Sequence, residues 1–284
     1  ELVTALAKSG GGSLALRFRQ AQPDAVTEAV KIVGDTAAAP DVRRQLIEIC
    51  GQIHAADLLP VLLDLVKREQ DASVLATTFT ALQNYDAAEI GDDVTRRFAE
   101  LAEEPQLAAE ALLVSRTIWS KQLLDAVDAG KISPDRISNS ALRKMLMHAD
   151  DSVSLAVAKL WGEISAISPA QVQAEISRLN TVLAAGTGNP RTGKSLFMQN
   201  CGRCHLLYEE GGRIGPDLTP FARNNMERML MSVVNPSLEI REGFENYVLV
   251  TNDGRVLNGF LADKDSQIVI LRGVDGQNTI VRRD

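Results

Sequence analysis

The segment Cys-Gly-Arg-Cys-His at residues 201–205 limits what this chain can fold into more than any other part of its sequence. If Cys201 ends a helix and Cys204 lies one turn further on, both sulfurs face one side, and the ring of His205 can swing in beside them. This pattern is typical of covalent c-type haem attachment, in which the thiols bond the porphyrin vinyl groups and the imidazole ligates the iron. We therefore expect one covalent haem c, with His205 as the proximal iron ligand and electron transfer as the chemistry.

Three other roles for the two thiols are weaker. Structural zinc needs a second pair of ligands, and Cys50, His54 and His148 lie far upstream. A thioredoxin-like redox pair belongs at a helix start in an α/β pattern, which this sequence lacks. A disulfide across the two intervening residues leaves His205 without a role.

Charge and hydropathy exclude several classes of protein. The formal net charge is -7, and the acidic excess lies wholly within residues 1–190. A surface of that sign repels phosphate backbones, so we expect no nucleic-acid partner. No apolar run approaches the ~20 residues that cross a bilayer, so we expect no membrane span. The chain begins Glu1-Leu2-Val3 without a leader, and we expect a processed or cut start.

The first part of the chain has a helical pattern. Apolar residues recur at helical spacing within residues 42–50, 58–65, 74–82 and 108–113. Asp41, Asp71 and Asp151 each precede such a stripe, and we expect them to cap helices. Helix pairs repeated at roughly 30–40 residues resemble HEAT-type repeats. The stretch 121–134 breaks the period, so an irregular helical bundle is the alternative. No catalytic set is expected here.

Two features of the first part could be read as ligand sites. Cys50 and His54 are one helical turn apart and could share a metal, but Cys50 continues an apolar stripe and is expected to be a buried thiol. His148 follows two methionines at a predicted helix end, where imidazole can bond free carbonyls. It could also reach a haem.

The sequence between the two parts predicts a helix and then a linker. Apolar residues continue at helical spacing through residues 172–182, and Gly, Asn and Pro follow in residues 184–190. Thr192 is then expected to cap a short helix that leads directly into Cys201.

A glycine-rich loop follows the motif. It reads Gly-Gly-Arg-Ile-Gly-Pro-Asp-Leu over residues 211–218. In cytochromes c a proline at this place leaves neighbouring carbonyls free to accept the second ring proton of the proximal histidine, which fixes the ring and raises its basicity; the similarity implies the same role for Pro216. An ordinary surface turn is the alternative. The expected cofactor-binding residues of this region are Gly215, Pro216 and Leu218, with Tyr208 and Arg213 able to meet a haem propionate.

The C-terminal residues predict a small antiparallel sheet. Two β-prone runs, 246–251 and 255–261, are joined by a turn that contains Asp253-Gly254. Two shorter runs, 267–271 and 279–281, flank a second turn around residues 274–276.

Residues 190–284 also resemble a known family. The motif, the 211–218 loop, Val-Asn-Pro-Ser-Leu-Glu-Ile at 234–240, Gly-Phe-Glu-Asn-Tyr at 243–247 and Asp-Gly-Arg-Val-Leu-Asn-Gly at 253–259 together look like the cytochrome c haem-binding domain of planctomycetes and verrucomicrobia. The resemblance implies a c-type cytochrome with a β insertion, at the C-terminal end of exported proteins behind helical repeats and sometimes behind a dehydrogenase-like β-propeller.

The resemblance also implies a distal methionine in a segment that would follow residue 284, so we expect the domain to continue further. Met226, Met229 and Met231 are the local candidates for the sixth ligand, although methionines of a helix over residues 225–234 could equally pack a core. An open sixth position would allow gas or peroxide binding.

These inferences together predict a mainly α protein with a HEAT-like α-solenoid at 1–166, a connecting helix and linker at 167–190, and a c-type cytochrome domain at 191–284. We expect a periplasmic or otherwise exported electron carrier that serves a redox partner protein or a fused dehydrogenase domain. The alternative is an interaction scaffold in which the haem is a sensor or a structural staple.

Overall fold

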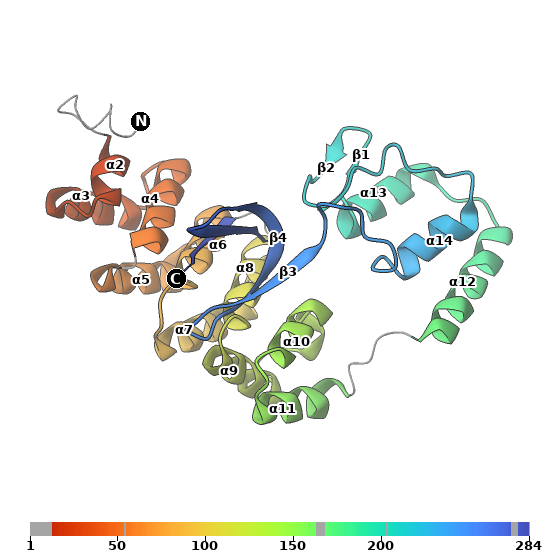
Figure 1. The fold of residues 1–284 in the computed structure, drawn as a ribbon, viewed down its shortest axis with the longest axis horizontal. Helices are drawn as coiled ribbons and strands as arrows, with labels where there is room; N and C mark the ends of the chain where they lie inside the picture. Colours follow the sequence, from red (N-terminus) through yellow and green to blue (C-terminus); the bar gives the residue numbers. More distant parts are fainter. Residues whose placement is uncertain (1–12, 54, 163–167, 203, 274–277, 284) are drawn as a thin grey trace. The chain divides into compact units, whose positions relative to one another are not determined.

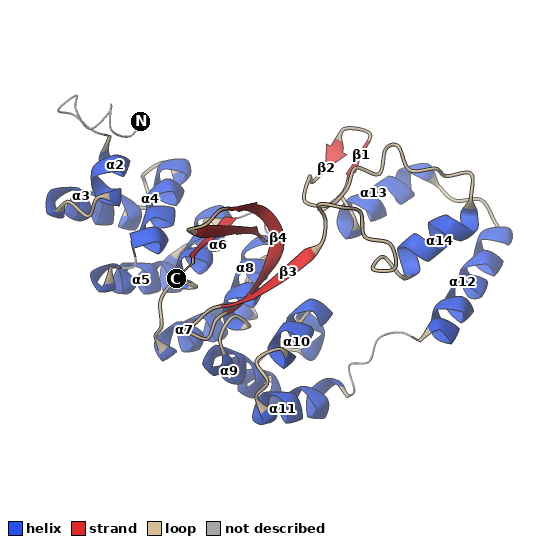
Figure 2. Cartoon of the chain, in the orientation of Figure 1, coloured by secondary structure: helices blue, strands red, loops and turns tan. Residues whose placement is uncertain are grey.

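The described chain is mainly helical with a small antiparallel sheet, as the sequence predicts (Figures 1 and 2). The computed structural model describes residues 13–53, 55–162, 168–202, 204–273 and 278–283. It divides into two compact units. The helical unit comprises Glu1–Ile164 with Val248–Leu257, and the motif unit comprises Ser165–Tyr247 with Asn258–Asp284.

The helices of the helical unit pack in two alternating series. Helix α2 contacts α4, α4 contacts α6 and α6 contacts α8, while α3, α5, α7, α9 and α11 contact one another in the same order. Their bounds are α2 Leu14–Arg19, α3 Pro23–Gly34, α4 Pro40–Ile53, α5 Leu59–Arg68, α6 Ala72–Leu82, α7 Ala88–Phe98, α8 Glu103–Leu113, α9 Thr117–Asp128, α10 Asn139–Leu146 and α11 Asp151–Trp161. Such packing buries one apolar stripe of each helix in a continuous core.

Two of the three predicted aspartate caps are wrong by one or two residues. Asp71 caps α6 as predicted, with its carboxylate accepting the N–H groups of Ser73 and Val74 at 3.0 Å. Helix α11 is capped by Asp150, and Asp151 lies inside its first turn. Asp41 likewise lies in the first turn of α4, behind Pro40. Aspartates at these inner positions still favour the positive end of the helix dipole.

A buried ion pair joins successive helices of this unit. Arg43 on α4 and Glu69, just after α5, are 2% and 4% exposed and pair directly. Arg43 Nε also donates to the carbonyl of Val33 at 3.1 Å. Later arginines behave similarly, because Arg97 donates to the Val66 carbonyl and Arg136 to the Leu101 carbonyl. These guanidinium groups thereby bond carbonyls at or just after the C-terminal ends of α3, α5 and α7, which lack partners within their own helices.

The motif unit carries three longer helices: α12 Pro169–Ala184, α13 Pro190–Asn200 and α14 Met226–Val234. Helices α12 and α14 pack together around a small apolar cluster of Val172, Ile176 and Leu230. A two-residue hairpin, β1 Leu206–Leu207 with β2 Glu210–Gly211, follows the motif.

The predicted meander is a four-stranded sheet of order β3-β4-β5-β6. Its strands are β3 Asn246–Val250, β4 Val256–Lys264, β5 Ile268–Arg272 and β6 Asn278–Arg282, and β5 pairs antiparallel with both β4 and β6. The register of β4 shifts between Leu261 and Asp263, which marks a bulge. The predicted second turn, around residues 274–276, lies outside the described residues.

The turn between β3 and β4 belongs to the helical unit. Arg116 is 5% exposed, stacks on Trp119 and donates to the backbone carbonyl and the carboxylate of Asp253 at 2.9 and 3.1 Å. Val256 N–H donates to the Ser115 carbonyl at 2.8 Å. Burial acts to raise the pKa of Asp253, but the Thr251 hydroxyl and the neighbouring arginines outweigh it and lower this pKa to about 2. The turn is thus held by charged and backbone bonds together.

None of the described helices combines the length and apolarity that a membrane span requires.

Candidate functional site

Helix α13 delivers Cys201. Pro190 occupies its first turn, and the side chain of Asn189 caps it by accepting the N–H groups of Arg191 and Thr192 at 2.9 and 3.2 Å. The prediction that Thr192 is the cap is therefore wrong, because a proline at the first helical position starts the helix three residues earlier. Cys201 closes the helix with its N–H on the Phe197 carbonyl at 2.7 Å.

The chain turns tightly after Cys201. The N–H groups of Cys204 and His205 both donate to the Cys201 carbonyl, at 3.1 and 2.9 Å. Both cysteines are free thiols, with Cys201 exposed and Cys204 half-buried. One turn therefore presents two free thiols and an imidazole from five consecutive residues. Arg203 lies outside the described residues.

The ring of His205 is held by the glycine-rich loop. Its Nδ1 lies 2.9 Å from the backbone carbonyl oxygen of Pro216. A carbonyl can only accept, so Nδ1 carries a proton, and the neutral tautomer with this contact has its lone pair on Nε2. Among the described residues no hydrogen bond engages Nε2. The Pro216 carbonyl thus fixes the orientation of the ring and leaves Nε2 facing away from this acceptor.

Two glycines allow this close approach. A Cβ built on Gly215 would lie 2.8 Å from Cε1 and 2.9 Å from Nδ1 of His205. Gly211 has φ +113°, and a Cβ there would lie 2.3 Å from the His205 carbonyl oxygen. The loop is anchored on both sides of Pro216, since Gly215 N–H donates to the Cys204 carbonyl and Leu218 N–H to the Leu206 carbonyl, both at 2.8 Å. Glycine at these positions is therefore a steric requirement.

We predict that Gly215→Ala displaces the His205 ring, because the added methyl group occupies its place. Overpacking of this kind costs about 1–3 kcal/mol, which denaturant unfolding of the motif unit can measure. Gly193→Ala is the matched control, since a Cβ there meets nothing within 4 Å and lies inside α13. The control should gain about 0.5–1 kcal/mol from helix propensity. Equal behaviour of the two variants would contradict the assigned contact.

The hairpin after His205 contains two residues in the left-handed region. Tyr208 and Glu209, with φ of 49° and 70°, form the two-residue turn between β1 and β2. Such primed turns favour Asn and Gly, so a Tyr-Glu turn needs support from its surroundings. Tyr208 N–H donates to Thr219 Oγ1 at 2.9 Å, and the guanidinium of Arg223 stacks over the Tyr208 ring at 5.3 Å. Sequence analysis missed Arg223, since no local pattern marks it.

The remaining predicted cofactor residues lie around this loop. Leu218 is half-buried, and Tyr208 and Arg213 are exposed. Met231 packs against the apolar cluster of α12 and α14, as a core methionine does. Met226 is exposed at the start of α14, and Met229 is half-buried.

Of the ligand candidates in the first part of the chain, Cys50 and His148 have structural partners in the helical unit. Cys50 is buried among apolar side chains, and burial raises its thiol pKa to about 12, so it is an inert thiol. His54 lies outside the described residues. His148 Nε2 lies 2.9 Å from the Val114 carbonyl, and burial lowers its pKa. Within the described ranges no group of three or more potential metal ligands gathers.

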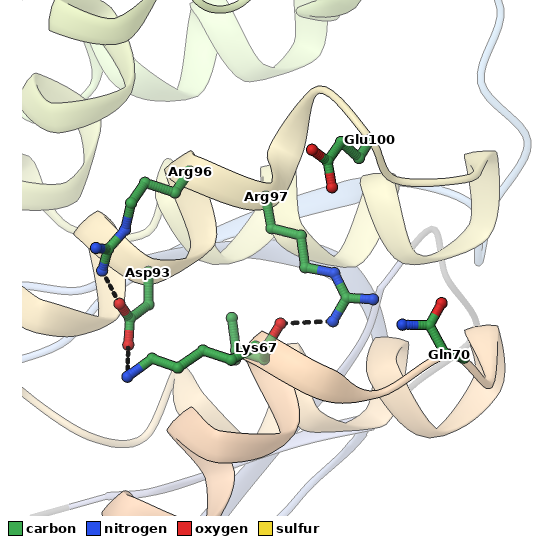
Figure 3. A pocket seen from close by; sticks show the side chains of 7 residues that line it. Lys67, Gln70, Asp93, Arg96, Arg97 and Glu100 are labelled. Atoms are coloured by element: carbon green, nitrogen blue, oxygen red, sulfur yellow. Dashed lines mark hydrogen bonds and ion pairs between the residues drawn. The ribbon is translucent and has the colours of Figure 1, made fainter.

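A polar groove of about 450 Å³ lies along α5 and α7 in the helical unit (Figure 3). Asp93 is buried and pairs with both Lys67, at 3.0 Å, and Arg96. Arg97 donates to the Val66 carbonyl at 2.6 Å. Lys67, Arg96 and Arg97 are thus each paired with an acceptor in the groove wall. We therefore assign the groove a structural role.

Within the described residues, one turn brings together Cys201, Cys204 and His205, with the Pro216 carbonyl behind the imidazole. Comparison with models of known protein families and with curated protein sequences finds no match for this chain.

Proposed function

We propose that residues 191–284 are a c-type cytochrome module that attaches one haem through Cys201 and Cys204 and uses His205 as the proximal iron ligand. The single observation that carries the proposal is the contact between His205 Nδ1 and the Pro216 carbonyl, at 2.9 Å. A backbone acceptor behind the imidazole selects the tautomer that ligates through Nε2. An ordinary surface histidine does not need this arrangement.

The residues present fit a haem c. The thiols are free and accessible at one turn, as thioether formation requires. Helix α13, which ends at Cys201, has no buried side chain among the described residues, and Leu196 is 54% exposed on it. Exposed apolar side chains on the helix that leads into Cys201 suit the apolar face of a porphyrin. When bound, the haem supplies reversible one-electron chemistry.

The protein's own contribution is to hold the ligand and to fix its tautomer and orientation. Pro216 keeps the proton on Nδ1, Gly215 and Gly211 let the loop approach the ring, and the tight turn fixes His205 next to Cys204. For the distal position, Met226 and Met229 are favoured over Met231, whose side chain already packs the core of α12 and α14. Tyr208 and Arg213 are exposed and can reach a propionate.

The helical unit is proposed as a HEAT-like docking scaffold for the electron partner or for an upstream dehydrogenase domain. The alternating contacts of its helices and the repeated bonds from arginines to helix-end carbonyls support this assignment. Because thioether attachment of haem takes place outside the cytoplasmic membrane, an exported or periplasmic location follows from the proposal.

The test is intact mass spectrometry, followed by redox titration, on the chain exported in a host that matures c-type cytochromes. We expect a mass gain of one haem and a reversible one-electron transition. A near-infrared sulfur-to-iron charge-transfer band would identify a methionine as the sixth ligand. A product with the mass of the bare polypeptide, or with zinc between the cysteines, would overturn the proposal. Gas binding to the reduced iron without electron exchange would favour the sensor alternative.

A further inference from the structure

The loop that presents the Pro216 carbonyl has no regular secondary structure of its own. It leaves the motif at Gly215 and reaches α14 at Met226. Two backbone bonds, from Gly215 N–H to the Cys204 carbonyl and from Leu218 N–H to the Leu206 carbonyl, hold the chain on either side of Pro216. One of these bonds is made by Leu218, two residues after Pro216. The contacts that hold residues 218–221 in place therefore also bear on the direction of the Pro216 carbonyl.

A single side chain gathers the carbonyls of that segment. The guanidinium of Arg223 donates through Nη2 to the Leu218 carbonyl at 2.8 Å. Through Nη1 it donates to the carbonyls of Thr219 and Phe221, at 3.1 and 3.0 Å. Three backbone oxygens that point at one planar group define the path of the chain between Leu218 and Phe221.

The same guanidinium also holds the other side of the site. It stacks over the ring of Tyr208, at 5.3 Å from the centroid, in the strained turn three residues after His205. Tyr208 N–H in turn donates to Thr219 Oγ1. Arg223 thus links the hairpin that follows His205 to the loop that carries Pro216, and that loop contacts the imidazole.

We propose that Arg223 is a positioning residue that fixes the Pro216 carbonyl against His205 Nδ1 and thereby sets the strength of His205 as an iron ligand. This inference rests on the proposed function. It does not place Arg223 on the haem, because its described partners are three carbonyls and one aromatic ring. Lysine at this position would keep the charge but lose the fork that spans three acceptors.

The experiment uses the full chain with haem attached, after the mass of each variant shows one haem. NMR of the reduced protein, made diamagnetic with carbon monoxide where the sixth position is open, measures the solvent exchange rate of the His205 Nδ1 proton. We expect Arg223→Ala to speed this exchange by about tenfold, the equivalent of one hydrogen bond. Arg223→Lys should have an intermediate effect.

The matched control is Arg228→Ala. Arg228 is also an exposed arginine of the motif unit, and it pairs with Glu239 at 3.3 Å, away from the Pro216 loop. Its removal should leave the Nδ1 exchange rate within about twofold of the parent. Backbone amide exchange in β5, recorded from the same spectra, reports whether a variant loosens the whole unit instead of this one bond.

The outcomes separate the two claims. Fast Nδ1 exchange with unchanged β5 amides in the Arg223 variants supports positioning. Attached haem with parental Nδ1 exchange in both Arg223 variants overturns the positioning role and leaves the proposed function intact. Equal acceleration of Nδ1 and of the β5 amides, even in Arg223→Lys, also overturns it, because Arg223 would then act on general stability. A parent chain without haem overturns both claims.

Discussion

Replacing Glu69 with alanine is expected to lower the free energy of unfolding of the helical unit by about 3–5 kcal/mol. The physical reason is that Arg43, 2% exposed, would keep its charge in the core without a counter-ion. The N–H groups of Gln70 and Asp71, now 2.9 and 2.8 Å from Glu69 Oε1, would also lose their acceptor. Urea unfolding of the full chain, followed by circular dichroism, measures the change.

Arg68→Ala is the matched control for this prediction. Arg68 is adjacent to Glu69 in the sequence, but it is 68% exposed and pairs with the exposed Asp64 on its own helix. Surface pairs of this kind contribute about 0–1 kcal/mol. The double variant Arg43→Met with Glu69→Leu should recover part of the loss, because no buried charge remains. A loss in Glu69→Ala as small as in the control would contradict the assignment of a buried pair.

The same pair predicts how stability depends on pH. Burial acts to raise the pKa of Glu69, but the hydrogen bond from Arg43 and those from the N–H groups of Asp71 and Gln70 outweigh it and hold this pKa below its ordinary value of 4.5. A carboxylate with a lowered pKa in the folded state stabilises the fold above its unfolded-state pKa. We therefore expect this contribution to be complete above about pH 4.5 and to be lost as the pH falls towards the folded-state value.

Removing both motif thiols is expected to abolish covalent haem completely. The variant Cys201→Ser with Cys204→Ser keeps the turn geometry but has no sulfur to bond the porphyrin. Each single substitution should leave one thioether and a lower yield of haem protein. Intact mass and the pyridine haemochrome spectrum of the exported chain measure both effects.

Cys50→Ala supplies the control, because it removes the third free thiol of the described chain. That thiol is buried, with its pKa raised to about 12 in an apolar core, so it cannot compete for a vinyl group. The variant should keep one haem and lose only packing energy in the helical unit. Retention of covalent haem in the double thiol variant would show that attachment does not use the motif.

The thiol variants and the loop variants test two parts of the same site, which the Pro216 carbonyl joins. Haem attachment tests the thiols, while the Gly215 and Arg223 variants test the proton acceptor behind His205. If the thiols hold haem and the loop variants leave the imidazole unchanged, the two parts of the site act independently. Gly215 N–H bonds the Cys204 carbonyl, and Gly215 is adjacent to Pro216 in the sequence. We therefore expect the two parts of the site to depend on each other.

Sequence patterns predicted the local features of this protein correctly. The helical spacing of apolar residues, the helix that ends at Cys201 and the antiparallel strands around Asp253-Gly254 all depend on residues within about two turns or one hairpin of each other. Such features follow from backbone propensity and side-chain period, which any short window of sequence contains. Errors arose at helix starts, where Asn189 and Asp150 cap in place of the predicted residues.

Only the tertiary structure decided which polar groups meet. Arg43 pairs with Glu69 across 26 positions, and Arg116 with Asp253 across 137, because stacked helices and a docked turn bring them together. The role of Arg223 is visible only in the folded loop, where its guanidinium bonds the carbonyls of Leu218 and Thr219. A charged side chain has no preferred partner within its own window of sequence, so its role is set by the carbonyls and carboxylates that the fold buries beside it.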